Sequence, residues 1–215
     1  MASDADARPL SEAAERRLKL AMDVGERSFS ALLFASFALR IGMALTHTPW
    51  DILGIVNEGL VVVFIVFRRG SMDVSTRPMD WLFALAGTGA PMLARPGGPP
   101  LVTPTVCAVL MLTGIFFAIW GKLILARSFG LAAANRGVVH TGAYHFVRHP
   151  IYAGYVVFYV GFWLLNPTLW NAGVYVAATA LLVIRILAEE RVLARDPVYA
   201  EYMSKVRFRL APGLF

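Results

Sequence analysis

The stretch that decides the fold is Leu101–Ile119, LVTPTVCAVLMLTGIFFAI, because it is apolar around almost its whole circumference. A helix on the surface of a soluble core keeps a polar face, and this stretch has almost none. The whole chain follows the same trend: 58% of its residues are hydrophobic, 16% are charged, and its mean hydropathy is +0.62. These values lie outside the usual balance of a soluble domain. The sequence therefore predicts an integral membrane protein.

Six apolar runs are separated by Pro, Gly and charged residues, and we interpret each as a membrane-embedded helix. They are Leu32–Leu45, Ile52–Phe67, Met79–Leu93, Pro104–Ala126, Ile151–Leu165 and Leu169–Ala188. The predicted fold is all-α and polytopic. Several runs are shorter than the roughly 20 residues that cross a bilayer core, which predicts tilted, interfacial or re-entrant helices. Ile151–Leu165 is the least secure of the six.

Three regions are expected along the chain. Residues 1–27 carry charge throughout and lack the apolar segment of a cleavable signal peptide, which favours a cytosolic or interfacial lead-in helix. Residues 28–126 hold four membrane helices. Residues 127–215 hold a polar loop, a helical hairpin and a tail. The single cysteine, Cys107, forms no intrachain disulfide, so nothing requires an oxidising compartment.

The basic residues predict the orientation in the membrane. With six spans, the N-terminus, the 68–78 loop, the 127–150 loop and the tail lie on one side and hold nearly all the Lys and Arg. Short loops rich in these residues stay in the cytoplasm. Both termini are thus expected at the cytoplasmic face, most simply of a bacterial inner membrane. Contact with anionic lipid explains the net charge of +6, and no nucleic-acid-binding pattern accompanies it.

An island of polar residues lies between two strongly apolar runs: Arg136–Tyr155, RGVVHTGAYHFVRHPIYAGY. It contains His140, His145 and His149, three of the four histidines of the chain. Histidine is a common metal ligand, but no carboxylate or cysteine completes a set here. We predict no metal site, and His140 and His145 have no assigned role.

A second polar group stands where the last apolar run ends. Arg185 and Glu189 are spaced to pair on one helix face, and Glu190 follows. The helices on either side of the Asn166-Pro167 turn are expected to be antiparallel neighbours, which would bring Arg148 and His149 close to Glu189 and Glu190. Carboxylates near a helix C-terminus oppose the helix dipole and require a compensating cation.

The order of these motifs resembles the isoprenylcysteine carboxyl methyltransferase and phospholipid methyltransferase families. The resemblance rests on TGAY at 141–144, VRHPIYAG at 147–154, an apolar hairpin, Glu189-Glu190, and Tyr199-x-x-Tyr202, and covers roughly residues 120–212. It implies an integral-membrane enzyme that uses S-adenosylmethionine. The first three apolar runs resemble no family that we recognise.

The resemblance also implies a set of site residues. Arg148 and Glu190 are the predicted catalytic pair, and the predicted cofactor-binding residues are Tyr144, Arg148, His149, Pro150, Tyr152, Gly154, Glu189, Glu190 and Tyr202. In chemical terms, Arg148 or His149 suits the donor carboxylate, and Glu189 or Glu190 suits its ammonium or ribose hydroxyls. Methyl transfer is an in-line displacement that needs alignment and exclusion of water more than acid–base groups.

The chain departs from the family at two positions. Arg136 stands near a position where the carboxyl methyltransferases often have His, and Ala143 where Pro is common. The acceptor therefore stays open between a prenylcysteine-like carboxylate, a phospholipid amine and a small thiol. An amine must lose a proton before it reacts, whereas a carboxylate is already nucleophilic. The sequence does not indicate an oligomeric state.

Each motif also has a simpler interpretation. Tyr144 and Tyr152 suit an interfacial aromatic belt, and Arg148 and Arg185 suit contact with lipid phosphates. Gly87-Thr88-Gly89 suits close helix packing, and the stripe of Tyr199, Tyr202, Met203 and Val206 suits either a cover over the donor site or core packing. Two alternative functions remain: an NADPH-dependent reductase of the sterol-reductase type, and a non-catalytic membrane module.

Overall fold

The computed structural model describes residues 12–44, 49–67, 78–125, 140–213 and 215. Within these residues the chain forms helices and no strand, as the all-α prediction requires. The helices are α1 (Glu12–Ala44), α2 (Ile52–Phe67), α3 (Pro78–Gly89), α4 (Pro104–Leu125), α5 (Pro150–Leu165), α6 (Leu169–Leu193) and α7 (Pro197–Lys205). Short 3₁₀ turns cover Pro49–Asp51, Pro91–Leu93 and Gly142–His145.

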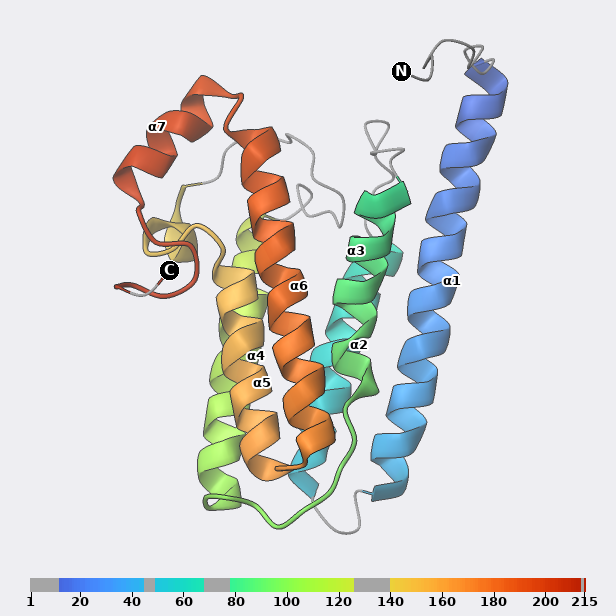
Figure 1. Ribbon diagram of the computed structural model, residues 1–215, viewed down its shortest axis with the longest axis vertical. Coiled ribbons are helices and arrows are strands. Elements are labelled where there is room, and N and C mark those ends of the chain that lie inside the picture. Colours follow the sequence, from blue (N-terminus) through green and yellow to red (C-terminus); the bar gives the residue numbers. More distant parts are fainter. Residues whose placement is uncertain (1–11, 45–48, 68–77, 126–139, 214) are drawn as a thin grey trace, which may run out of the picture.

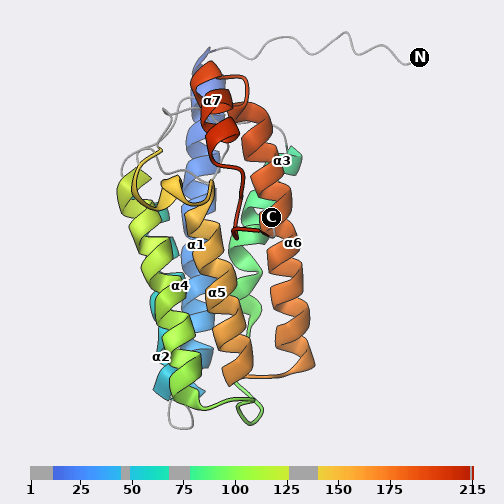
Figure 2. The same ribbon diagram turned by 90° about the vertical axis from the view of Figure 1, so that its left-hand side faces the viewer.

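Helices α1 to α6 lie side by side with their long axes nearly parallel, and α7 lies across one end of them (Figures 1 and 2). The start of α1 and α7 share this end, which we call the tail end. The turn between α5 and α6 and the segment between α3 and α4 lie at the other end, the hairpin end. The polar residues around 148 and 190 therefore meet at the tail end.

The N-terminal part of the bundle differs from the sequence-based boundaries. A single helix, Glu12–Ala44, runs through the boundary expected at residue 27, so the lead-in helix and the first apolar run are one element. Gly25 does not interrupt it, because one helical glycine costs only about 1 kcal/mol relative to alanine. Leu20 and Val24 are exposed on its surface, as expected for residues facing lipid or protein. Predictions for residues 1–11, 68–77 and 126–139, including Arg136, lie outside the described residues.

Two of the described helices are both long and apolar enough to cross a membrane, Pro104–Leu125 and Leu169–Arg191. At 22 and 23 residues, each spans about 33 Å at 1.5 Å per residue, which matches a hydrocarbon core of about 30 Å. The apolar helix Pro150–Leu165 is shorter than this, in line with its being the least secure prediction. Six membrane-embedded helices and the side on which the termini lie stay predictions.

The outer surface of the bundle is apolar while its interior holds charge. On α4, Val109, Phe116 and Leu123 are all more than half exposed, at 57%, 59% and 63%. On the inward face of the same helix, Lys122 is 1% exposed, and Glu58 of α2 is 4% exposed. A soluble protein shows the opposite arrangement, because water solvates charge and excludes apolar groups. The distribution fits a bundle surrounded by lipid.

Glycines allow α4 and α5 to approach closely. A Cβ added to Gly154 of α5 would lie 2.5 Å from the carbonyl oxygen of Gly114 on α4, and one on Gly121 would lie 2.7 Å from Ile151 Cγ1. A Cβ added to Gly89 of α3 would lie 2.7 Å from Leu33 Cδ2, which supports the packing interpretation of the Gly87-Thr88-Gly89 motif. The contact between α4 and α5 holds the start of α5, where the polar site begins.

A cluster of buried amides holds the hairpin end together. Asn166 Nδ2 donates to Asp51 Oδ1 at 2.7 Å, and Gly97 N donates to Asn166 Oδ1 at 2.8 Å. Asn171 Nδ2 donates to the carbonyls of Arg95 and Asn166, at 2.7 and 2.8 Å. We call Asp51, Asn166 and Asn171 the amide cluster. It ties the α5–α6 turn to the segments that precede α2 and α4.

Candidate functional site

The candidate site is formed by the start of α5 and the end of α6. Pro150 is in the first turn of α5, where its missing N–H leaves no helical hydrogen bond unmade, and His149 caps that helix. Glu189 and Glu190 lie in the last turns of α6, which ends at Leu193. Because α5 and α6 are antiparallel around the Asn166-Pro167 turn, these ends lie together at the tail end (Figure 1). The predicted approach of 148–149 to 189–190 is confirmed.

Glu190 is the centre of the cluster. Arg148 Nε donates to Glu190 Oε1 at 2.7 Å, and His149 Nε2 lies 3.2 Å from the same oxygen. The other oxygen, Oε2, accepts a hydrogen bond from Arg209 Nε at 2.8 Å. Arg148, His149 and Glu190 are all buried. The carboxylate thus has three basic partners, and the guanidinium groups of Arg148 and Arg209 supply the compensating charge that its place near a helix C-terminus requires.

The C-terminal tail holds the other side of this cluster. The backbone N–H groups of Arg148 and His149 donate to the carbonyls of Phe208 and Arg209, each at 2.9 Å. Arg148 Nη1 also donates to the Val206 carbonyl at 3.0 Å. The extended tail therefore fixes both the backbone and the side chain of Arg148. We call Arg148, His149, Glu190 and Arg209 the ionic cluster.

Glu189 has a different set of partners. Tyr152 Oη donates to Glu189 Oε1 at 2.6 Å, and Arg185 Nε donates to the same oxygen at 3.1 Å, which confirms the predicted pairing of Arg185 with Glu189. The Tyr152 ring is stacked on the His149 ring with their centroids 5.7 Å apart and an interplanar angle of 13°. Tyr152 and His149 thus connect the surroundings of Glu189 to the ionic cluster.

The predicted tyrosines of the tail pack over the loop that precedes α5. Tyr144, Tyr199, Tyr202 and Val206 form one buried group, against which Met203 packs. Tyr202 Oη donates to the Tyr144 carbonyl at 2.6 Å. Burial disfavours the phenolate and raises the pKa of Tyr202 to about 12, and it raises the pKa values of Tyr144 and Tyr199 well above the usual range. These hydroxyls stay protonated at neutral pH.

One predicted cofactor-binding residue, Gly154, is in a different environment from the ionic cluster, and so are His140 and His145, which have no assigned role. Gly154 faces Gly114 and Ala118 of α4, so helix packing accounts for it. His145 is exposed and makes an edge contact with Phe146, and His140 is exposed as well. The three histidines do not converge, and in the described parts of the chain no three His, Cys, Asp or Glu side chains are grouped to hold a metal ion.

Sequence reasoning missed Arg209, Glu58 and Lys122. Arg209 lies in a basic stretch of the tail, KVRFRL, whose composition is typical of a solvated surface. Its contact with Glu190 depends on how the tail turns back after α7. Glu58 and Lys122 were counted as parts of apolar runs, although a carboxylate or ammonium in such a run is by itself a signal of function or of buried pairing.

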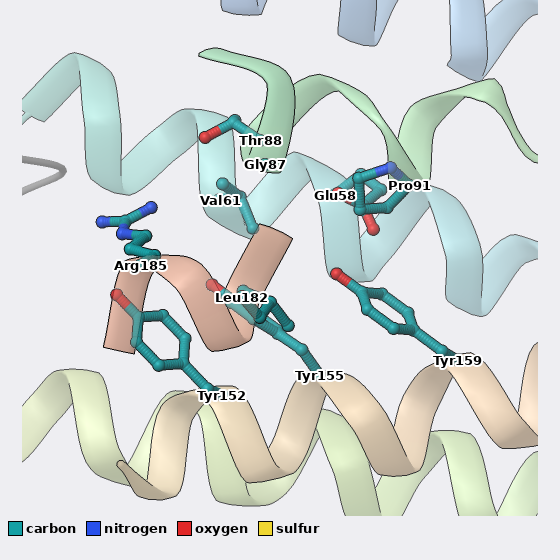
Figure 3. A pocket seen from close by; sticks show the side chains of 10 residues that line it. All are labelled: Glu58, Val61, Gly87, Thr88, Pro91, Tyr152, Tyr155, Tyr159, Leu182 and Arg185. Atoms are coloured by element: carbon teal, nitrogen blue, oxygen red, sulfur yellow. The ribbon is translucent and has the colours of Figure 1, made fainter. Parts of the chain in front are cut away.

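A cavity of about 30 Å³ lies beside Glu189, deeper in the bundle. Tyr152 and Arg185 line it at one end, Glu58 and Tyr159 lie at the other end, and Tyr155 lies between the two ends (Figure 3). Helices α2 and α3 form one wall, and α5 and α6 form the opposite one (Figure 3). Because Tyr152 lines the cavity and also donates to Glu189, the cavity adjoins the candidate site.

The family comparison supports the resemblance drawn from the motifs. The model of the isoprenylcysteine carboxyl methyltransferase (ICMT) family matches residues 103–195. This segment begins just before α4 and includes α5, α6 and the residues Arg148, His149, Glu189 and Glu190. Glu58 precedes it, and Arg209 follows it. No curated protein matches the chain. The matched family is one of methyltransferases, and its description together with the apolar helices indicates an integral membrane protein.

Proposed function

We propose that this chain transfers the methyl group of S-adenosylmethionine to a lipophilic or membrane-associated acceptor at the tail end of the bundle. The observation that carries the proposal is the ionic cluster, in which Arg148, His149 and Glu190 belong to the ICMT-matched segment and Arg209 follows it. The charges of the cluster come from the residues just before α5, from α6 and from the tail, which are separate in sequence. Such a convergence of buried charge costs free energy unless the groups are paired, so it points to a site maintained for a purpose beyond stability.

The residues present fit the chemical groups of the donor. The donor carries a carboxylate, an ammonium and ribose hydroxyls, and the site offers guanidinium groups beside carboxylates. Arg148 and Glu190 are engaged with each other, and each side chain is 5% exposed. The side chains of Arg209 and Glu189 are 29% and 17% exposed. We therefore assign Arg209 and Glu189 to the direct contacts with the donor carboxylate and ammonium. Glu190, itself bonded to Arg148, holds Arg209 in place.

The residues around this site would also limit access of water. When bound, S-adenosylmethionine supplies an electrophilic methyl group on a sulfonium. The His149–Tyr152 stack gives a flat aromatic surface beside the carboxylates, and α7 with Tyr199 and Tyr202 covers the loop before α5. Alignment and exclusion of water are the contributions that a displacement at a methyl group needs from the protein.

We further propose that the tail end faces the cytoplasm. The tail contains Arg191, Arg195, Lys205, Arg207 and Arg209, and basic segments beside membrane helices stay on the cytoplasmic side. Their positive charge also favours contact with anionic lipid headgroups. A bacterial inner membrane is the location that this arrangement suggests.

The test is calorimetric titration of the detergent-purified protein with S-adenosylhomocysteine, with NADPH titrated in parallel. Binding of S-adenosylhomocysteine alone is the expected result. Binding of NADPH alone would favour the reductase alternative. If neither ligand binds to the folded protein, the resemblance describes the fold and the proposed activity is wrong.

A further inference from the structure

The cavity beside Glu189 contains a carboxylate from outside the ICMT-matched segment. Glu58 of α2 is 4% exposed and accepts a hydrogen bond from Asn57 Nδ2 at 3.0 Å. In the described parts of the chain, no Lys, Arg or His nitrogen lies within 4.0 Å of its carboxylate. A carboxylate so deep in an apolar bundle is costly to maintain without a close cation. Packing alone would be better served by an apolar residue.

Lys122 of the neighbouring helix α4 is a cation that acts on Glu58. Its ammonium lies over the rings of Phe64 and Tyr155, 5.0 and 5.2 Å from their centroids. Its charge interacts with Glu58 through space, but Lys122 does not line the cavity. Lys122 thus balances part of the charge without entering the cavity, which Glu58 lines.

Aromatic rings form the wall next to Glu58. Tyr155 and Tyr159 lie one turn apart on α5, stacked at 17° with centroids 6.5 Å apart, and Tyr159 stacks on Tyr175 at 4.7 Å. Figure 3 shows the side chains of Tyr155 and Tyr159 reaching from α5 toward the wall that carries Glu58. A carboxylate beside aromatic rings is suited to a protonated amine, which gains from the ion pair and from the ring faces.

Arg185 also lines the cavity, and a guanidinium alone would favour an anionic ligand. Its charge is already matched, because Arg185 Nε donates to Glu189 at 3.1 Å and its guanidinium lies 5.4 Å from the centroid of the Tyr152 ring. A carboxylate in the cavity would gain little from this matched pair and would be repelled by Glu58.

We propose that the cavity receives the reacting end of the methyl acceptor, that this end is an amine, and that Glu58 takes its proton. This inference rests on the proposed methyl transfer and selects among the acceptors that the motifs leave open. The volume of about 30 Å³ holds about two water-sized groups, which suits a primary amine at the end of a longer molecule. A donor at Glu189 and an acceptor in the cavity would meet beside Tyr152.

The reaction balances in two steps. An ammonium group that enters the cavity transfers one proton to the Glu58 carboxylate and becomes a neutral amine. The amine nitrogen then forms a bond to the methyl carbon as the carbon–sulfur bond breaks, and that electron pair stays on sulfur. The products are a methylammonium group and the neutral thioether, and Glu58 returns its proton to solvent when the product leaves.

The experiment compares three acceptors with the same alkyl chain: dodecylamine, dodecanoate and dodecanethiol. The detergent-purified full chain is supplied with methyl-labelled S-adenosylmethionine, and labelled product is counted for each acceptor. We expect dodecylamine to be the preferred acceptor. We also expect Glu58→Gln to lower its turnover by 100-fold or more, in the range of general-base effects, with S-adenosylhomocysteine affinity within twofold of the original.

The control is Glu201→Gln, which makes the same chemical change at an exposed residue of α7 paired with Lys205. Preference for dodecanoate or dodecanethiol, or no methylation of dodecylamine, would overturn the inference, and neither result depends on how a variant folds. Retention of more than half of the turnover by Glu58→Gln would also overturn it. Failure of the unaltered protein to bind S-adenosylhomocysteine would instead overturn the proposed function itself.

Discussion

The ionic cluster and the amide cluster lie at opposite ends of the α5–α6 hairpin, and both are buried and hydrogen-bonded. The ionic cluster joins the charges of Arg148, Arg209 and Glu190, whose carboxylate accepts from both guanidinium groups. The amide cluster bonds mainly to backbone: Asn171 satisfies the Arg95 carbonyl, and Asn166 satisfies the Gly97 N–H.

The ionic cluster therefore has the features of a ligand-binding site, and the amide cluster has those of a structural contact. Amide side chains that satisfy backbone groups hold segments in place and leave little for a ligand. Charged side chains of both signs cost more to bury, but they can exchange partners with a charged ligand. We therefore expect changes in the ionic cluster to affect ligand binding first, and changes in the amide cluster to affect stability alone.

The largest effect on ligand binding is expected from Glu190→Gln. The amide oxygen can still accept one hydrogen bond from Arg148, so the bundle should stay folded, but Arg148 and Arg209 lose the charge that holds them together. We expect the affinity for S-adenosylhomocysteine to fall by 100-fold or more, measured by calorimetry. Glu201→Gln is the matched control and should bind normally. Unchanged binding by Glu190→Gln would place the donor elsewhere.

A large loss of stability is expected from Asn166→Ala in the amide cluster. The substitution removes the hydrogen bonds to Asp51 and from Gly97 N in a buried region. Loss of such bonds, with groups left unsatisfied, should lower the free energy of unfolding by about 3 kcal/mol. Thermal unfolding in detergent measures this. Leu169→Ala, at a residue that is 94% exposed, should change it little.

Calorimetric titration of Asn166→Ala with S-adenosylhomocysteine tests whether the two clusters act separately. At a temperature where Asn166→Ala is folded, its affinity for S-adenosylhomocysteine should match that of the unaltered protein. A specific loss of affinity in this variant would mean that the two ends of the hairpin do not act separately.

The smallest effect is expected from Tyr202→Phe, beside the ionic cluster. It removes the hydrogen bond to the Tyr144 carbonyl and should cost about 1 kcal/mol of stability. Tyr199→Phe is the control, since its ring belongs to the same buried group. Urea unfolding of the two variants would be compared at neutral pH, and equal losses would contradict the role of the Tyr202 hydroxyl.

The pH dependence of the Tyr202 contribution follows from its pKa, which burial raises from 10.0 to about 12. Below pH 10 the hydroxyl is protonated in both the folded and the unfolded chain, so its contribution is constant. Between pH 10 and 12 the unfolded chain loses this proton and the folded chain keeps it, so stability falls as the pH rises. The difference between Tyr202→Phe and the unaltered protein should shrink over that interval.

Local sequence patterns predicted the C-terminal half of the fold well. Pro150 predicted the start of α5, the Asn166-Pro167 turn predicted the antiparallel hairpin, and the spacing of Arg185 and Glu189 predicted their pairing. Each of these depends on residues within a few turns of each other. The N-terminal half was predicted less closely, because one helix, α1, runs through a boundary drawn from a change in charge. Charge sets the surroundings of a helix more than it sets where the helix ends.

The sequence by itself determined that the chain is helical, apolar on its outer surface and polar around Arg148 and Glu190, because hydropathy and helix signals are local. Only the tertiary structure decided that Arg209 completes the ionic cluster and that Glu58 faces the cavity beside Glu189. Arg209 is 19 residues from Glu190. Glu58 is on α2, whereas Tyr152 and Arg185, the cavity residues that contact Glu189, are on α5 and α6. Contacts of this kind depend on how the tail folds back and how α2 packs on α5, and no local pattern encodes either.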